Sequence, residues 1–414
     1  MQISSNVQSI HTPIDPHTTE QDTPKHTVQY SPSSNSTLKS TPQERTHKLH
    51  QNPDLLNGLK RKREEGPSKP IRHIRILGTG GTIAGTAKNK TQTSGYEAGK
   101  KNIGELLQEV LPDFNLPKHI HVSAQDVFQI DSKDLTDSHW LTLAQTVSNE
   151  LEKEEVHGVV ITHGTDTLAA TSFFLNMTVH SKKPIVIVGS MRPATAISSD
   201  GPMNLNAAIR VAKSHKSIGN GVMVMANDKI YSASDVAKKH TTHVNAFQAE
   251  NSGPMGSFAN NKVYFHTKPA RRHTADSQFN IKNIAQPLPA TYILYSQVGQ
   301  PQLTVQHIQL AVEQHVRGLI YAGTGDGTMH AEIEKKLREV VNQGVLVVRA
   351  SKVGAGPVVH NAAIEDEEAL FVSADVHNPD QSAILAKLAL TELPEGKALE
   401  IQDIRKVQRL FKHY

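Results

Sequence analysis

Residues 74–85 read IRILGTGGTIAG, so a short apolar run leads directly into a loop of glycines and threonines. The apolar run predicts a buried strand, and the glycines allow a substrate to approach the backbone. Residues 159–167, which read VVITHGTDT, repeat the arrangement. Ligands of open α/β sheets bind outside the carboxyl ends of the strands. The two loops are therefore predicted to present the hydroxyls of Thr82 and Thr165 at such an edge.

Apolar runs and helix-length stretches alternate around these loops. This alternation predicts right-handed crossovers and a buried parallel sheet with helices on both faces. The expected strands are 74–77, 119–122, 159–162, 185–188 and 222–225, and the expected helices are 102–110, 140–151, 167–179 and 204–213. The fold class is therefore α/β, with a larger N-terminal domain predicted at residues 71–285.

Residues 269–289 contain three prolines around a polar middle, which is typical of an interdomain connection. Beyond them the alternation resumes, which predicts a smaller C-terminal α/β domain at residues 290–414. Its expected strands are 292–295, 318–322 and 345–350, and its expected helices are 305–315, 330–342 and 380–393.

The first seventy residues differ in composition from the rest. Residues 1–70 are dominated by Ser, Thr, Pro, Gln, Asn and His, and Tyr30 is their only aromatic residue. Such a segment buries too little apolar surface to offset the entropy of ordering it, so we predict a disordered N-terminal extension. Its basic run, residues 60–63, resembles a localisation signal or a nucleic-acid contact, but a solvated linker is the favoured interpretation.

Composition excludes several classes of function. The chain has no cysteine, which removes disulfides and thiol chemistry, and its net charge is only +4, without the concentrated basic face of a nucleic-acid-binding protein. No window is apolar enough to cross a membrane, and no ordinary secretory signal opens the sequence, so a soluble protein is expected and the cytoplasm is favoured. The 23 histidines form no helical metal-binding pair, so no metal is expected.

A nucleotide site is an alternative interpretation of the first loop. The dinucleotide fingerprint requires a glycine three places after Gly80, where Ile83 stands, and a phosphate-binding loop would need Gly-Lys-Thr or Gly-Lys-Ser. The loop is better suited to hold Thr82 where backbone N–H groups can receive an oxyanion.

A threonine hydroxyl needs a group that takes its proton. Tyr96 lies in a polar loop, residues 90–100, that is long enough to fold over Thr82, so its phenol is one candidate. A second candidate is Lys238, which follows another predicted strand and could act on a threonine with Asp166 orienting it.

Several ordered motifs now resemble one family. Residues 79–85 and 161–167 resemble the two signature loops of bacterial-type L-asparaginases and glutaminase-asparaginases. The likeness extends through GSMRP at 189–193, SDGPMNL at 199–205, PARRHT at 269–274 and HNP at 377–379, and it covers residues 71–414.

The resemblance implies hydrolysis of the side-chain amide of asparagine by a homotetramer of intimate dimers, without metal or cofactor. Thr82 would be the acylated nucleophile with Tyr96 as its lid partner, and Thr165, Asp166 and Lys238 would form a second triad. Ser132 occupies the place that binds the substrate α-carboxylate. With Lys133, Gly164, Thr165 and Asp166, it makes up the expected substrate-binding set.

Three positions depart from the family pattern near the substrate α-ammonium. Lys133 stands where Gln or Glu is usual, Thr328 replaces a helper Asn, and Ala363 occupies the place of a Glu from the neighbouring subunit. Lys133 could turn into a salt bridge with Asp131 or Asp134, with Asp326 or Glu365 supplying the missing acid. Otherwise the pocket is adapted to a substrate with a weaker or absent α-ammonium, or has lost efficient turnover.

Two hypotheses follow. The first is an L-asparaginase, acting also on L-glutamine if the lid around Tyr96 admits the extra methylene. The second is a protein of the same fold with retuned or weak activity that binds an amino acid or a partner. The departures at Lys133, Thr328 and Ala363 favour the second, whereas the five catalytic candidates favour the first.

Overall fold

The structure is a computed structural model that describes residues 71–97 and 99–414. The predicted N-terminal extension and its basic run lie outside the described residues. Within the described part, no helix is long and apolar enough to cross a membrane.

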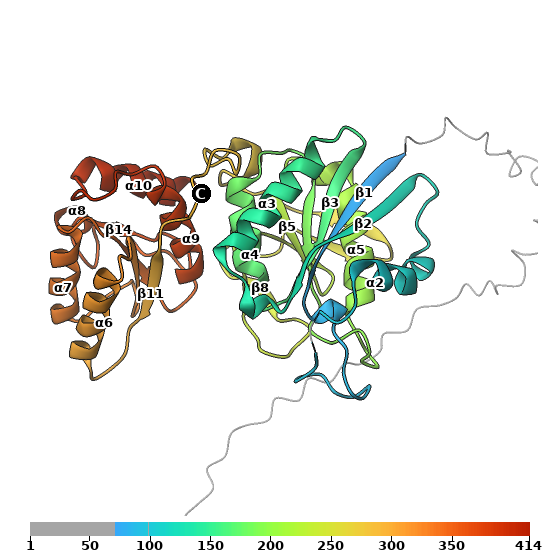
Figure 1. Ribbon diagram of the computed structural model, residues 1–414, viewed down its shortest axis with the longest axis horizontal. Coiled ribbons are helices and arrows are strands. Elements are labelled where there is room, and N and C mark those ends of the chain that lie inside the picture. Colours follow the sequence, from blue (N-terminus) through green and yellow to red (C-terminus); the bar gives the residue numbers. More distant parts are fainter. Residues whose placement is uncertain (1–70, 98) are drawn as a thin grey trace, which may run out of the picture. The chain divides into compact units, whose positions relative to one another are not determined.

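A mixed eight-stranded sheet forms the larger part of the fold (Figure 1). Its order is β10-β9-β6-β5-β4-β3-β1-β2, and the five strands from β5 to β2 are mutually parallel. The strands are β1 (Arg72–Gly80), β2 (Ile120–Ile130), β3 (Val156–Thr162), β4 (Ile185–Val188), β5 (Val222–Ala226), β6 (Lys229–Ser232), β9 (Gly256–Ala259) and β10 (Lys262–Phe265). A separate hairpin pairs β7 (Val236–Lys238) with β8 (Phe247–Ala249).

Helices cover both faces of this sheet. Val159 and Ile161 of β3 pack in one apolar core with α3 (Asp137–Glu152) and α4 (Leu168–Thr178). Val160 packs in the opposite core with α2 (Ile103–Val110) and α5 (Gly201–Lys213). Successive side chains of a strand point to opposite faces, so a strand buried on both sides must be apolar throughout. The predicted α/β class and parallel central strands are confirmed.

A parallel four-stranded sheet forms the C-terminal part, in the order β11-β12-β13-β14. Its strands are β11 (Thr291–Tyr295), β12 (Gly318–Gly323), β13 (Leu346–Ser351) and β14 (Phe371–Ser373). Its helices are α6 (Pro301–Glu313), α7 (Ala331–Val341), α8 (Asp366–Ala369), α9 (Pro379–Leu390) and α10 (Ile401–His413).

Some elements were not anticipated. The antiparallel strands β6, β9 and β10 are only four residues long and extend one edge of the first sheet. Strands this short have too few residues to show a periodic pattern in the sequence. Tight turns end them, and the turn residues Asn227, Asp228, Asn260 and Asn261 all have positive φ. Helix α10 lies beyond the last predicted element and buries its apolar side, including Phe411.

Two glycines hold the ends of β1 and β3 together. Gly81 has a φ of 81°, and a Cβ placed on it would lie 2.3 Å from the backbone nitrogen of Gly164. Next to this close approach of Gly81 and Gly164, the Thr79 hydroxyl donates a 2.8 Å hydrogen bond to the carbonyl oxygen of Thr162. Any side chain at Gly81 would force the two loops apart, so glycine is required there for steric reasons.

His377 is buried where the two parts of the fold meet. Its ring packs edge-on against Phe173 of α4 and Phe411 of α10, and burial, followed by the charge of Arg271, lowers the pKa of His377 to about 4. His163 is fully buried beside the first sheet, and burial lowers its pKa to about 4 as well. Both imidazoles are therefore neutral in the folded protein at neutral pH.

The two buried histidines predict a loss of stability in mild acid. Between pH 6.5 and 4 these two histidines bind protons in the unfolded chain but not in the folded chain. The free energy of unfolding is therefore highest above this range and decreases as the pH falls through it. Each histidine contributes a loss of about 1.4 kcal/mol per pH unit. We expect the unfolding free energy of His377→Gln, measured in urea, to fall less than that of wild type between pH 7.5 and 5.5. The exposed His307→Gln is the control, and equal losses in wild type and His377→Gln would contradict the account.

Candidate active site

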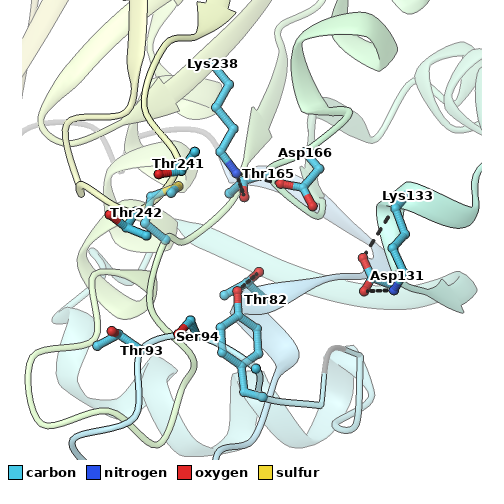
Figure 2. Close-up of a pocket in the computed structure, with 13 residues that line it drawn as sticks. Thr82, Thr93, Ser94, Asp131, Lys133, Thr165, Asp166, Lys238, Thr241 and Thr242 are labelled. Atoms are coloured by element: carbon cyan, nitrogen blue, oxygen red, sulfur yellow. Dashed lines mark hydrogen bonds and ion pairs between the residues drawn. The ribbon is translucent and has the colours of Figure 1, made fainter. Parts of the chain in front are cut away.

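A cavity of about 380 Å³ lies beside the two threonine loops (Figure 2). Its lining is mostly polar. The lining residues are Thr82, Thr93, Ser94, Gly95, Tyr96, Asp131, Lys133, Thr165, Asp166, Met191, Lys238, Thr241 and Thr242. The cavity therefore brings together all five residues that the sequence predicted as catalytic.

Thr82 opens a single turn of 3-10 helix, η1 (Thr82–Ala84), immediately after Gly81. Its hydroxyl lies 2.7 Å from the hydroxyl of Tyr96, and the Thr82 residue is only 6% exposed. Tyr96 reaches it because the chain turns back on itself, with Thr86 and Glu97 paired through their backbones. Within the described residues, this segment therefore folds over Thr82 as predicted.

Burial raises the pKa of Tyr96 above 10.0, and its hydrogen bond with Thr82 opposes the shift. The negative charges of Asp166, Asp131 and Asp200 raise the pKa further. The phenol is consequently protonated at neutral pH and can pass a proton on only by accepting one as it gives up its own.

Thr165, Asp166 and Lys238 form a second hydrogen-bonded group. The Lys238 amine donates to the Thr165 hydroxyl at 2.9 Å and to Asp166 Oδ1 at 2.6 Å. Lys238 ends β7 of the separate hairpin, whereas Thr165 and Asp166 come from the loop between β3 and α4. The hairpin thus brings Lys238 to the carboxyl edge of the parallel sheet.

Ser132 and Gly164 lie against each other, and neither is among the residues that line the cavity. A Cβ on Gly164 would lie 2.5 Å from the Ser132 hydroxyl oxygen, so only glycine fits at that position. Ser132 is 3% exposed, and within the described residues its hydroxyl has no hydrogen-bond partner. A buried hydroxyl without a partner is costly, so it is suited to binding a polar group of a ligand. His163 supports the loop by hydrogen bonding from Nδ1 to the Gly164 carbonyl oxygen at 2.7 Å.

Lys133 also lines the cavity and is paired with acids of its own segment. Its amine lies 2.5 Å from Asp131 Oδ2 and 3.8 Å from Asp134 Oδ2. The hydrogen bond with Asp131 raises the pKa of Lys133, so it remains a cation. The salt bridge predicted as one alternative is therefore present, although the lysine has not left the cavity wall.

The other departures lie in loops of the C-terminal sheet, and none of them lines this cavity. Asp326 is held by the backbone nitrogen of Val359, which donates to its Oδ1 at 2.7 Å. Both loops are fastened by the fully buried Arg349, which pairs with Asp366 at 2.6 Å and donates to the Asp326 carbonyl oxygen.

Sequence reasoning did not single out Thr93, Ser94, Thr241 and Thr242 as site residues. All four are hydroxyl-bearing residues of exposed loops around the cavity mouth, and nothing in their local sequence distinguishes them from other loop residues. Asp131 was considered only as a partner for Lys133. The described residues contain no group of three or more His, Asp and Glu side chains that could hold a metal ion.

Comparisons with known proteins agree with this geometry. Residues 73–271 match the family model "Asparaginase, N-terminal", and residues 297–406 match "Glutaminase/Asparaginase C-terminal domain". A glutaminase-asparaginase of Acinetobacter glutaminasificans is 38% identical over 334 residues, covering 80% of this chain and 98% of the relative. L-asparaginase 2 of Bacillus subtilis is 37% identical over 346 residues, covering 84% and 88% respectively.

A solved structure is similar as well. The crystal structure of a probable cytoplasmic L-asparaginase from Campylobacter jejuni has a TM-score of 0.75 and 37% identity, covering 83% of this chain and all of that one. The two family models together match most of both sheets, and the relatives are covered over 88% and 98% of their length. The chain therefore belongs to the asparaginase family.

Proposed function

We propose that the protein is an L-asparaginase that hydrolyses L-asparagine to L-aspartate and ammonia, with L-glutamine as a second substrate to be tested. The observation that carries the proposal is the pairing in one cavity of two threonine hydroxyls with separate partners. Thr82 is hydrogen-bonded to Tyr96, and Thr165 to Lys238. Family membership supports the same reaction class.

Thr82 is assigned the nucleophilic role. Its oxygen attacks the side-chain carbonyl carbon of the substrate while its proton passes to the Tyr96 phenol, whose own proton moves to the leaving nitrogen. Ammonia departs, an ester of Thr82 remains, and water hydrolyses the ester to release the acid. A neutral phenol suits this relay, because it needs both a proton to give and a lone pair to accept one.

Thr165, Asp166 and Lys238 are assigned to proton transfer at the opposite wall. Asp166 orients the Lys238 amine toward the Thr165 hydroxyl, and the three groups form a hydrogen-bonded unit before substrate arrives. Such preorganisation lowers the cost of reaching the reactive geometry. Ser132 is assigned to the substrate α-carboxylate, with its unpartnered hydroxyl as the donor, and Gly164 leaves it the necessary space.

A second candidate function is that of an amino-acid-binding protein with weak turnover. It is favoured by Lys133, a cation at the cavity wall, and by Thr328 and Ala363, which lack the amide and the acid usual at their positions. The hydrogen-bonded pairs of Thr82 and Thr165 favour the enzyme instead, because a binding site needs neither.

The homotetramer implied by the family resemblance is also proposed, with domains at 71–285 and 290–414. It would explain why loops carrying Asp326 and Glu365 are fastened away from this chain's own cavity: they would serve a neighbouring subunit. Sedimentation of the full chain is expected to give four times the chain mass, and a monomer that is fully active would contradict the assignment. The cytoplasmic location remains a prediction.

Replacing the nucleophile separates the two candidate functions. Thr82→Val keeps the shape of the side chain and removes the hydroxyl, so ammonia release from asparagine should fall by roughly a thousandfold or more. The measurement is coupled ammonia release from asparagine and from glutamine. Thr142→Val, which removes an exposed hydroxyl on α3, is the matched control and should retain wild-type activity. If wild type and Thr82→Val both released ammonia at the same negligible rate, the proposal that the protein is an enzyme would be wrong.

A further inference from the structure

The cavity contains two carboxylates, and each is bonded to a lysine. Asp166 pairs with Lys238 at 2.6 Å, and Asp131 pairs with Lys133 at 2.5 Å. The formal charges of these four lining residues cancel. A neutral wall built from two ion pairs is suited to a ligand that is itself a zwitterion, because each of its charges meets an opposite charge.

The Asp131 side chain is held in place by its own segment. It precedes a single turn of 3-10 helix, η3 (Ser132–Asp134), and its Oδ1 faces the backbone nitrogen of Lys133 at 3.5 Å. Its neighbour Ser132 is anchored in turn, since the Thr167 hydroxyl donates to the Ser132 carbonyl oxygen at 2.9 Å. The carboxylate is therefore positioned by backbone geometry before any ligand binds.

Asp131 is also the deeper member of its pair. Its side chain is 34% exposed, whereas that of Lys133 is 64% exposed. Figure 2 shows both on the side of the cavity away from Thr241 and Thr242. An ionised carboxylate offers about four lone-pair sites. The hydrogen bond from Lys133 occupies one of these lone-pair sites, so the Asp131 carboxylate can still accept a hydrogen bond from a second cation.

We propose that Asp131 is a specificity-determining residue, whose carboxylate accepts the α-ammonium of the amino acid, and that Lys133 moderates this attraction. The proposal rests on the proposed function, since it names the substrate group that Asp131 recognises. Asp131 lies in the same chain and lines the cavity, whereas Asp326 and Glu365, the acids considered as replacements from the sequence, do not line it. Lys133, which interacts with both Asp131 and Asp166, then limits the repulsion between the two carboxylates.

This arrangement predicts opposite effects for the two neighbours. Asp131→Asn removes the negative charge and leaves the Lys133 cation at the wall, so preference for a ligand carrying an ammonium should fall by about tenfold. Lys133→Gln frees the carboxylate from its competing partner, so the same preference should rise by about threefold to tenfold. A merely structural role would weaken binding of all ligands in both variants alike.

The experiment compares two ligands that are not consumed. L-Aspartate and succinate differ only in the α-ammonium, and the ratio of their dissociation constants, measured by calorimetry at pH 7, reports its recognition alone. Asp134→Asn is the matched control, because Asp134 also lies near Lys133 but does not line the cavity. Its ratio should equal that of wild type.

The inference is supported if the preference for aspartate falls in Asp131→Asn, rises in Lys133→Gln and is unchanged in Asp134→Asn. It is overturned if Asp131→Asn keeps the wild-type ratio, if both variants shift in the same direction, or if neither ligand binds wild type. Ammonia release from asparagine by wild type is measured separately. An inactive protein with these ratio shifts would refute the proposed function and leave the recognition by Asp131 intact.

Discussion

The close approach of Gly81 to Gly164 is the constraint on which the site depends. It places the end of β1 against the end of β3, and therefore Thr82 and Thr165 on one cavity. A single methyl group at either position would meet backbone or the Ser132 hydroxyl at 2.5 Å or less. The geometry of the candidate site is thus set by backbone packing between two strand ends.

Around this crossing the structure assembles groups from distant parts of the chain. The 90–100 loop supplies Tyr96, the β7–β8 hairpin supplies Lys238, and η3 supplies Asp131 and Lys133. Each acid that lines the cavity is paired with a lysine, and the hydroxyls of Thr82 and Thr165 are hydrogen-bonded to Tyr96 and Lys238. The site therefore holds its charges in neutral pairs, which suits a small zwitterionic amide more than a large or strongly charged ligand.

Sequence reasoning predicted much of this because the central strands are apolar and the loops after β1 and β3 carry glycine and threonine. The loops and the family resemblance together predicted the pairing of Thr82 with Tyr96 and of Thr165 with Lys238, and both pairs are hydrogen-bonded in the structure. The antiparallel strands were missed since they are too short for a pattern. Thr241 and Thr242 were missed because only the hairpin's position makes them part of the cavity. The depth of Asp131 relative to Lys133 depends on the η3 turn, which no sequence pattern specified.

Thr82, and not Thr165, is proposed to carry the acyl group. Wild-type protein is mixed with asparagine and quenched in acid within the first turnovers. Peptide mapping by mass spectrometry then shows which threonine carries the acyl group. An aspartyl ester is expected on the peptide that contains Thr82, and none is expected on the peptide that contains Thr165. An ester on Thr165, or ammonia release with neither residue modified, would contradict it.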